Sequence, residues 1–178
     1  DSHASFLSLQ LFCGLSFLLA IKITSKLSNF ILHQFGVYTN FRILPTNSSL
    51  VSYTKLSPNH SGQRTHSIDR ITPHCVVGQL SCESICGCFT SPSRQASCNY
   101  GIGKDGRISL CVEEKNRSWC SSSNANDQRA VTIECASDTK HPYTMNSTVY
   151  ATLIKLCVDI CKRNGKKKLI WLGNKKRL

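Results

Sequence analysis

The sequence has few acidic residues and no pair of cysteines separated by two residues. Its 178 residues include 10 Asp and Glu against 22 Lys and Arg, so the formal net charge is +12. The basic residues are concentrated between Lys155 and Leu178, and such a basic end favours anionic surfaces such as nucleic acid, acidic lipid or teichoic polymers. The missing C-x-x-C spacing argues against the usual structural zinc motif and against a thioredoxin-like redox motif.

Eleven cysteines are nevertheless present. Cys82, Cys86 and Cys88, and later Cys157 and Cys161, lie at helical offsets within apolar stretches. We therefore expect most cysteines to be small buried hydrophobes in a reducing compartment, rather than members of a disulfide framework.

A run without charged residues extends from Ala4 to Ile21. This run is just long enough for a membrane span, although four polar residues weaken it, and a secretory signal would follow a basic segment rather than Asp1. Residues 1–45 are interpreted as a hydrophobic extension. We expect them to form a membrane or interfacial helix or a packed amphipathic extension, or to lie outside the functional domain. A stretch rich in Ser, Asn and Pro at residues 46–62 marks the boundary to a domain over residues 46–178.

After this boundary, short apolar runs predict strands. Strands are expected within residues 66–77, at residues 129–136 and at residues 168–172, and a hairpin is expected over residues 99–112. The hairpin turn is at Lys104-Asp105-Gly106, since Asp and Gly tolerate the positive φ of tight turns. Pro73 places its position at a strand end or on a sheet edge, because proline cannot donate to a sheet ladder.

Two helices are predicted between these strands. Residues 81–89 form a short helix with Ser81 as its cap and one face made of Ile85, Cys88 and Phe89. Residues 146–164 carry an apolar stripe at helical spacing and end before Gly165, at a C-cap position. Strands that alternate with helices indicate an α/β fold.

Three segments carry a resemblance to a known family. They read I-T-P-H-C at residues 71–75, N-Y-G-I-G-K-D-G-R-I at residues 99–108 and S-W-C-S-S-S-N-A-N-D-Q-R-A-V-T-I-E at residues 118–134. In this order and spacing they resemble the zinc-dependent N-acetylmuramoyl-L-alanine amidases of type 2, the cell-wall-cleaving domains of phage endolysins and bacterial autolysins, which are related to peptidoglycan recognition proteins. The resemblance extends from about Leu50 to Leu172. It implies a mixed central sheet flanked by helices.

The resemblance also implies roles for two titratable residues. His74 falls where the family has a zinc-binding histidine at the end of a strand, and Glu134 matches an acid that activates or protonates at the zinc-bound water. Without the resemblance, a histidine near an apolar run is more often a structural residue, and a strand carboxylate is more often simply solvated.

The resemblance also assigns positions to three further residues. The family tyrosine that contacts the reacting centre corresponds to Cys98, and Tyr100 lies two residues on, where it either substitutes in catalysis or packs. Trp119 and Asn126 match residues of a loop that walls the substrate groove, although Trp119 equally fits a core position.

The sequence departs from the family in the rest of the metal site. Family members carry a second histidine, then Cys, Asp or His, and a nearby lysine, in a segment that follows the strand at residues 168–172. That segment is absent here, and His141 does not match it. A single histidine gives too few ligands for catalytic zinc, so either the domain is truncated at its C-terminus or zinc binding is lost.

The resemblance implies a peptidoglycan hydrolase that uses zinc to cleave the amide between N-acetylmuramic acid and L-alanine. Such a hydrolase would act at the cell wall or outside the cell, or would be cytoplasmic before phage-type release. The alternatives are a catalytically inactive peptidoglycan-binding module and a small basic protein anchored to the membrane through Ala4 to Ile21. Specific nucleic-acid binding is not expected, because no aromatic residues alternate with the C-terminal charges.

Overall fold

The main structural feature is a mixed five-stranded sheet. The computed structural model describes residues 46–171, which lie within one compact unit, Leu44–Leu178. The strand order is β1-β5-β4-β7-β3. The strands are β1 (Val51–Thr54), β3 (Arg70–Cys75), β4 (Tyr100–Ile102), β5 (Ile108–Leu110) and β7 (Ala130–Cys135). The β4–β5 pair is antiparallel and the other three pairs are parallel. The predicted α/β fold with a mixed central sheet is therefore confirmed.

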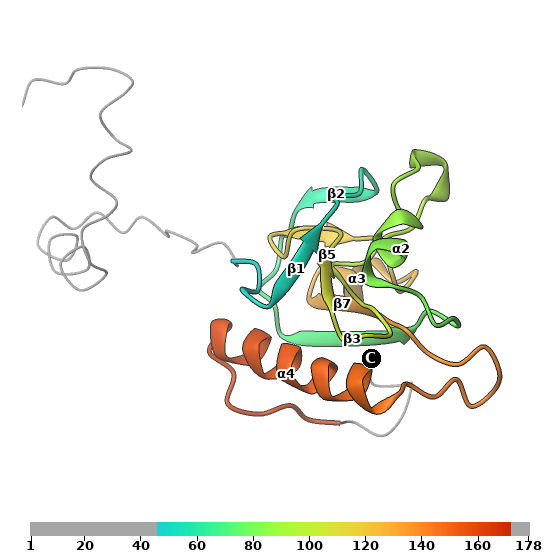
Figure 1. The fold of residues 1–178 in the computed structure, drawn as a ribbon. Coiled ribbons are helices and arrows are strands. Elements are labelled where there is room, and N and C mark those ends of the chain that lie inside the picture. Colours follow the sequence, from blue (N-terminus) through green and yellow to red (C-terminus); the bar gives the residue numbers. More distant parts are fainter. Residues whose placement is uncertain (1–45, 172–178) are drawn as a thin grey trace, which may run out of the picture. The chain divides into compact units, whose positions relative to one another are not determined.

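The remaining elements are a small second sheet and the helices around the main sheet. The second sheet pairs β2 (His60–Gln63) with β6 (Asn116–Ser118) in antiparallel fashion. The helices are α2 (Cys82–Gly87), the 3-10 turn η2 (Pro92–Arg94), α3 (Asn124–Asp127) and α4 (Ser147–Arg163). Figure 1 shows α4, the longest helix among residues 46–171, lying along the main sheet.

The main sheet separates two apolar cores. One core joins α4, through Val149, Leu153, Leu156 and Ile160, to inward residues of β4, β5 and β7. The other core joins Ile85 and Cys86 of α2 to Cys98 and Cys111. The close approach of α2 to β4 requires glycine at position 101, because a Cβ there would lie 2.7 Å from Ile85 Cγ2.

Strand β7 shows how the sequence pattern produces this division. Val131, Ile133 and Cys135 are fully buried and belong to the core under α4. Successive side chains of a strand point to opposite faces, so Thr132 and Glu134 point to the other side. Glu134 is only partly buried. The predicted strand, with Glu134 on its less apolar face, is confirmed, but the strand is not half-buried, because Thr132 on the same face as Glu134 is also fully buried.

The hairpin and the long helix are also confirmed. Tyr100 pairs with Leu110 and Ile102 with Ile108 across the hairpin, and Gly106 in its turn has a φ of +81°. The helix α4 begins after Asn146, whose side chain accepts a hydrogen bond from the amide of Val149 at 2.9 Å.

The short helix differs from its prediction in one residue. Ser81 caps it as expected, and Ile85 and Phe89 are buried, but Cys88 is exposed. The buried residues Cys82, Ile85, Cys86 and Phe89 follow the i, i+3, i+4, i+7 spacing of one helical face, and Cys88 lies off this face.

Two other segments also differ from the prediction. Residues 46–62 were expected to be a turn-rich boundary, but they contain β1 and the start of β2, which pair with strands distant in sequence. Residues 168–171, expected to begin a strand, have no regular structure and no strand partner in the described part of the chain. Their apolar side chains are consequently exposed, with Trp171 at 88%.

Most described cysteines are unpaired. Cys86 and Cys111 form a disulfide, whereas eight other cysteines of residues 46–171 are free thiols. Cys82, Cys98 and Cys135 are buried, as expected of small hydrophobes, but the other five free thiols are partly buried or exposed, so most of the described free cysteines do not fit that expectation. The Cys86–Cys111 pair is an exception that the spacing did not predict.

The hydrophobic run from Ala4 to Ile21 lies outside the described residues. Among residues 46–171, no helix has both the length and the apolar character needed to span a membrane.

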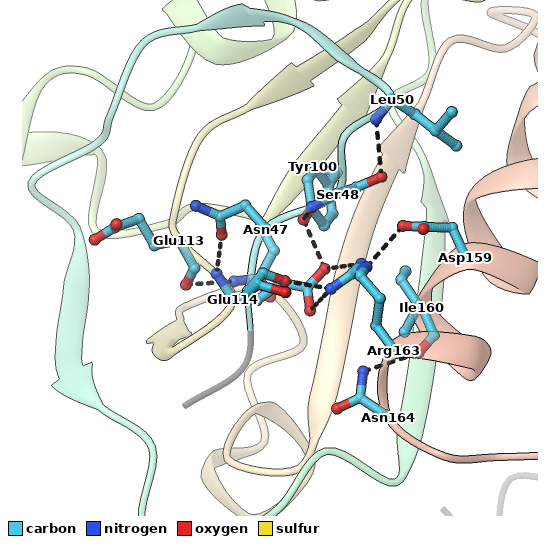
Figure 2. A network of polar contacts seen from close by, with 12 residues as sticks. Asn47, Ser48, Leu50, Tyr100, Glu113, Glu114, Asp159, Ile160, Arg163 and Asn164 are labelled. Atoms are coloured by element: carbon cyan, nitrogen blue, oxygen red, sulfur yellow. Dashed lines mark hydrogen bonds and ion pairs between the residues drawn. The ribbon is translucent and has the colours of Figure 1, made fainter. Parts of the chain in front are cut away.

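A buried ionic network fixes the C-terminal end of α4 to the sheet (Figure 2). Glu114 has no exposed surface, and its carboxylate accepts hydrogen bonds from Arg163 at 2.6 and 2.9 Å and from the hydroxyl of Tyr100 at 2.6 Å. The backbone amide of Ser48 in turn donates to the Tyr100 hydroxyl at 2.8 Å. A buried charge is tolerated only when it is paired and hydrogen-bonded. The network therefore requires Arg163, the last residue of α4, to stay beside Glu114.

We predict that Arg163→Ala lowers the free energy of unfolding by about 3 kcal/mol, because it leaves the buried carboxylate of Glu114 without its cation. Urea unfolding of the full chain measures the change. Lys155→Ala is the matched control, since Lys155 is an exposed cation on the same helix, and it should change stability by less than about 0.5 kcal/mol. Equal effects of the two substitutions would contradict a stabilising role for the network.

Candidate metal centre

The register of β3 and β7 places His74 directly beside Glu134. The two strands are parallel and in continuous register from Arg70 with Ala130 to Cys75 with Cys135. Residues paired in this way point to the same face of the sheet. His74 Nδ1 lies 3.6 Å from Glu134 Oε1. Because β3 is the last strand of the sheet, His74 stands at its rim, and Pro73 occupies the edge position that its missing N–H group requires.

A third side chain, Cys120, completes the cluster. Its sulfur lies 3.6 Å from His74 Nδ1 and 3.8 Å from Glu134 Oε1. The side chains of His74 and Glu134 are 34% and 14% exposed, so solvent reaches the cluster.

The segment carrying Cys120 is held along β7 by hydrogen bonds. The hydroxyls of Ser118 and Thr132 lie 2.8 Å apart, two residues before Cys120 and Glu134 respectively. This contact sets the segment alongside the strand, with Cys120 over Glu134. The segment therefore depends on the register of β7, as His74 does.

Asp127 at the end of α3 fixes the same segment from the other side. Its buried carboxylate accepts hydrogen bonds from the amides of Cys120 at 3.0 Å and Ser121 at 3.1 Å, and from the Ser121 hydroxyl at 2.5 Å. Charge-assisted hydrogen bonds of this kind are stronger than neutral ones. Asp127 thus positions the backbone from which the Cys120 thiol extends.

The electrostatics of the cluster follow from Glu134 and from burial. The hydrogen bond to Glu134 raises the pKa of His74 above its usual value, although burial opposes this shift. Burial raises the pKa of the Cys120 thiol well above its usual range, and the negative charge of Glu134 adds to the effect. Without a metal, Cys120 is therefore a neutral thiol, unlike the low-pKa thiolates of cysteine nucleophiles.

The structure places Tyr100 away from this cluster. Tyr100 is fully buried in the core under α4, and its hydroxyl donates to Glu114. Its register partner is Ile133, which faces the side of the sheet opposite to Glu134. The expected catalytic role of Tyr100 is therefore corrected to the packing alternative. Burial keeps its pKa above its usual value, so the phenol stays protonated.

The two residues expected at the substrate groove lie on the segment that contains Cys120 and α3. Trp119 is half-buried, and its indole N–H donates to Ser61 at 2.7 Å. Asn126 is 7% exposed, and its amide group donates to Thr72 and Ser121 at 3.1 Å each. Trp119 thus keeps an accessible surface, whereas Asn126 links α3 to β3.

The donor atoms of the cluster fit a zinc ion. Ligand atoms of His74, Cys120 and Glu134 lie within 4.8 Å of one another. Imidazole nitrogen, thiolate sulfur and carboxylate oxygen are the donors zinc takes from proteins, and catalytic zinc typically has three protein ligands and one open position. Sequence analysis identified His74 and Glu134 but missed Cys120. Cys120 lies 46 residues from His74, and no spacing rule connects the two.

Comparisons with known proteins identify the family of the chain and its fold. The chain belongs to the N-acetylmuramoyl-L-alanine amidase family, whose model matches residues 63–171. This membership defines the chain as a hydrolase of the peptidoglycan amidase class. No curated protein sequence matches the chain.

Solved structures show the same fold at low sequence identity. A selenomethionine derivative of AmpD is 17% identical with a TM-score of 0.55, and the match covers 67% of this chain and 78% of that chain. A mutant endolysin from Bacillus subtilis is 13% identical with a TM-score of 0.53, covering 65% of this chain and 77% of that chain. PlyL is 10% identical with a TM-score of 0.54, covering 64% and 74%.

We predict that Asp127→Asn speeds amide hydrogen exchange at Cys120 and Ser121 by at least about tenfold, because it removes charge-assisted hydrogen bonds that contribute about 1.5–3 kcal/mol. Mass spectrometry or NMR on the full chain measures the exchange rates. Asp138→Asn, at an exposed aspartate, is the control and should leave both rates unchanged. Unchanged rates in Asp127→Asn would show that other contacts hold the segment.

Proposed function

We propose that this chain hydrolyses the amide bond between N-acetylmuramic acid and L-alanine in peptidoglycan with the aid of a zinc ion, and that it acts at the cell wall. The single observation that carries the proposal is the pairing of His74 with Glu134 at a solvent-accessible rim of the sheet, in a chain of the amidase family. A metal ligand beside a carboxylate is the minimal arrangement for metal-assisted hydrolysis.

In this proposal, His74 holds the metal and Glu134 moves the proton. A bound zinc ion lowers the pKa of a water ligand and polarises the scissile carbonyl. The Glu134 carboxylate accepts the proton of the attacking water and returns it to the leaving amino group of L-alanine. Its Oε1 lies 3.6 Å from Nδ1 of His74, so the proposed base stands beside the residue that would hold the metal.

Trp119 is proposed to contact the substrate beside this centre. Its ring is held by the hydrogen bond to Ser61 and remains partly exposed on the segment next to Cys120. An aromatic ring fixed in this way offers a flat apolar surface to a sugar or to a stem peptide. Asn126 is proposed to support the segment that carries Trp119, through its hydrogen bonds to Thr72 and Ser121.

We predict that the full chain, loaded with zinc and incubated with purified peptidoglycan, releases new L-alanine amino termini and no new reducing sugar ends. Glu134→Gln should lower this rate by about 10²- to 10⁴-fold, because the amide cannot accept the proton. Glu113→Gln, which removes a surface carboxylate paired with Lys115, is the control and should retain the rate. Product analysis by mass spectrometry reads both outcomes.

New reducing ends would instead indicate a glycosidase. Binding to peptidoglycan without any release of L-alanine amino termini would contradict the enzymatic proposal and support the peptidoglycan-binding module.

We further predict that removing the metal abolishes the hydrolysis. Dialysis of the full chain against a chelator should reduce the rate to background, and one equivalent of zinc should restore it, whereas magnesium should not. Magnesium prefers six oxygen ligands, and the imidazole nitrogen of His74 suits zinc better than magnesium. Full activity in the chelated protein, verified by metal analysis, would contradict a metal-dependent mechanism.

A further inference from the structure

Cys120 lies at the proposed centre, but the reaction described above gives it no role. It is half-buried, and its sulfur faces both His74 and Glu134. Within residues 46–171, these three residues are the group whose ligand atoms gather closely enough to hold one ion.

The spacing of the three donor atoms is that of ligands around a single tetrahedral ion. Zinc binds nitrogen and oxygen at about 2.0–2.2 Å and sulfur at about 2.3 Å, so two donors at a tetrahedral angle are separated by about 3.3–3.6 Å. The three observed separations are 3.6 Å for His74–Cys120, 3.6 Å for His74–Glu134 and 3.8 Å for Cys120–Glu134. An ion could therefore be accommodated with shifts of a few tenths of an ångström.

The three donors are carried by backbone that is already fixed. His74 and Glu134 are register partners on adjacent strands, and Asp127 holds the amides of Cys120 and Ser121. Metal sites gain affinity when their ligands are oriented by surrounding hydrogen bonds. Asp127 is a positioning residue in this sense, since it touches the backbone of Cys120 rather than the cluster's donor atoms.

We propose that Cys120 binds the metal as a thiolate beside His74, so that this chain holds its ion through a nitrogen and a sulfur. The inference rests on the zinc site of the proposed function and adds a ligand to it. The thiol proton leaves to solvent when the metal binds, as metal–thiolate formation requires. Glu134 completes the triangle of donors. A carboxylate has two oxygens, so one can face the ion while the other accepts a proton.

Cobalt(II) spectroscopy on the full chain tests this inference without reference to activity. A cobalt–thiolate bond gives a near-ultraviolet charge-transfer band that nitrogen and oxygen ligands do not give. Titration with cobalt under nitrogen should produce this band with a 1:1 endpoint. Cys120→Ser should remove the band and weaken cobalt binding by about 100-fold or more, which exceeds the roughly 10- to 100-fold that loss of an outer-shell partner typically costs. Cys88→Ser, at an exposed thiol outside the cluster, should leave band and affinity unchanged.

A second measurement uses the unmodified chain, in case Cys120→Ser fails to fold. Zinc should slow the alkylation of Cys120 by iodoacetamide, read by peptide mapping, and should leave the alkylation of Cys88 unchanged. A charge-transfer band that persists in folded Cys120→Ser, cobalt binding without the band, or equal alkylation with and without zinc would each overturn the inference.

The two proposals fail in different ways. If the chain releases L-alanine amino termini with zinc but shows no thiolate band, the function stands and Cys120 is not a ligand. If the band appears and depends on Cys120 but peptidoglycan is not cleaved, the metal site stands and the hydrolytic function fails.

Discussion

The continuous parallel register of β3 and β7 is the constraint on which the rest of this structure depends. It sets His74 opposite Glu134. It also directs Ile133, the residue before Glu134, into the apolar core under α4. Since the side-chain period of a strand is two, a slip of one residue would turn Glu134 into the apolar core and Ile133 toward solvent. The burial of Val131 and Ile133 therefore fixes the geometry of the metal centre.

The two faces of the sheet divide stability from chemistry. On the α4 side, the sheet is covered by a core of buried apolar residues and by the Glu114–Arg163 network, which includes Tyr100. On the other side, a segment held by Asp127 leaves His74 and Glu134 partly exposed. The buried carboxylate of Glu114 stabilises α4 because hydrogen bonds and an ion pair satisfy it. The cluster of His74, Cys120 and Glu134 instead keeps solvent-accessible donor atoms that a metal ion could bind.

Local sequence patterns predicted the elements whose formation depends on neighbouring residues. The alternation in β7, the turn at Gly106 and the stripe of α4 were all read correctly, because each is determined by a short repeat or by one backbone requirement. The family resemblance supplied His74 and Glu134, which the β3–β7 register then brings together.

The features that sequence reasoning missed depend on contacts between distant segments. The strands in residues 46–63 form because β5 and β6 pair with them. The apolar run at residues 168–171 has no strand partner among residues 46–171, although its composition suits a strand. Tyr100 matched a reactive position by order but faces the opposite side of the sheet. Cys120 reaches the centre only because the hydrogen bonds of Ser118 and Asp127 hold its segment over β7.

The most direct test of this account is X-ray absorption at the zinc edge on the full chain loaded with one equivalent of zinc. The account predicts a first shell with one sulfur at about 2.3 Å together with nitrogen and oxygen at about 2.0–2.2 Å. A first shell of nitrogen and oxygen alone would remove Cys120 from the centre. A chain that retains no zinc after dialysis would contradict the metal site itself.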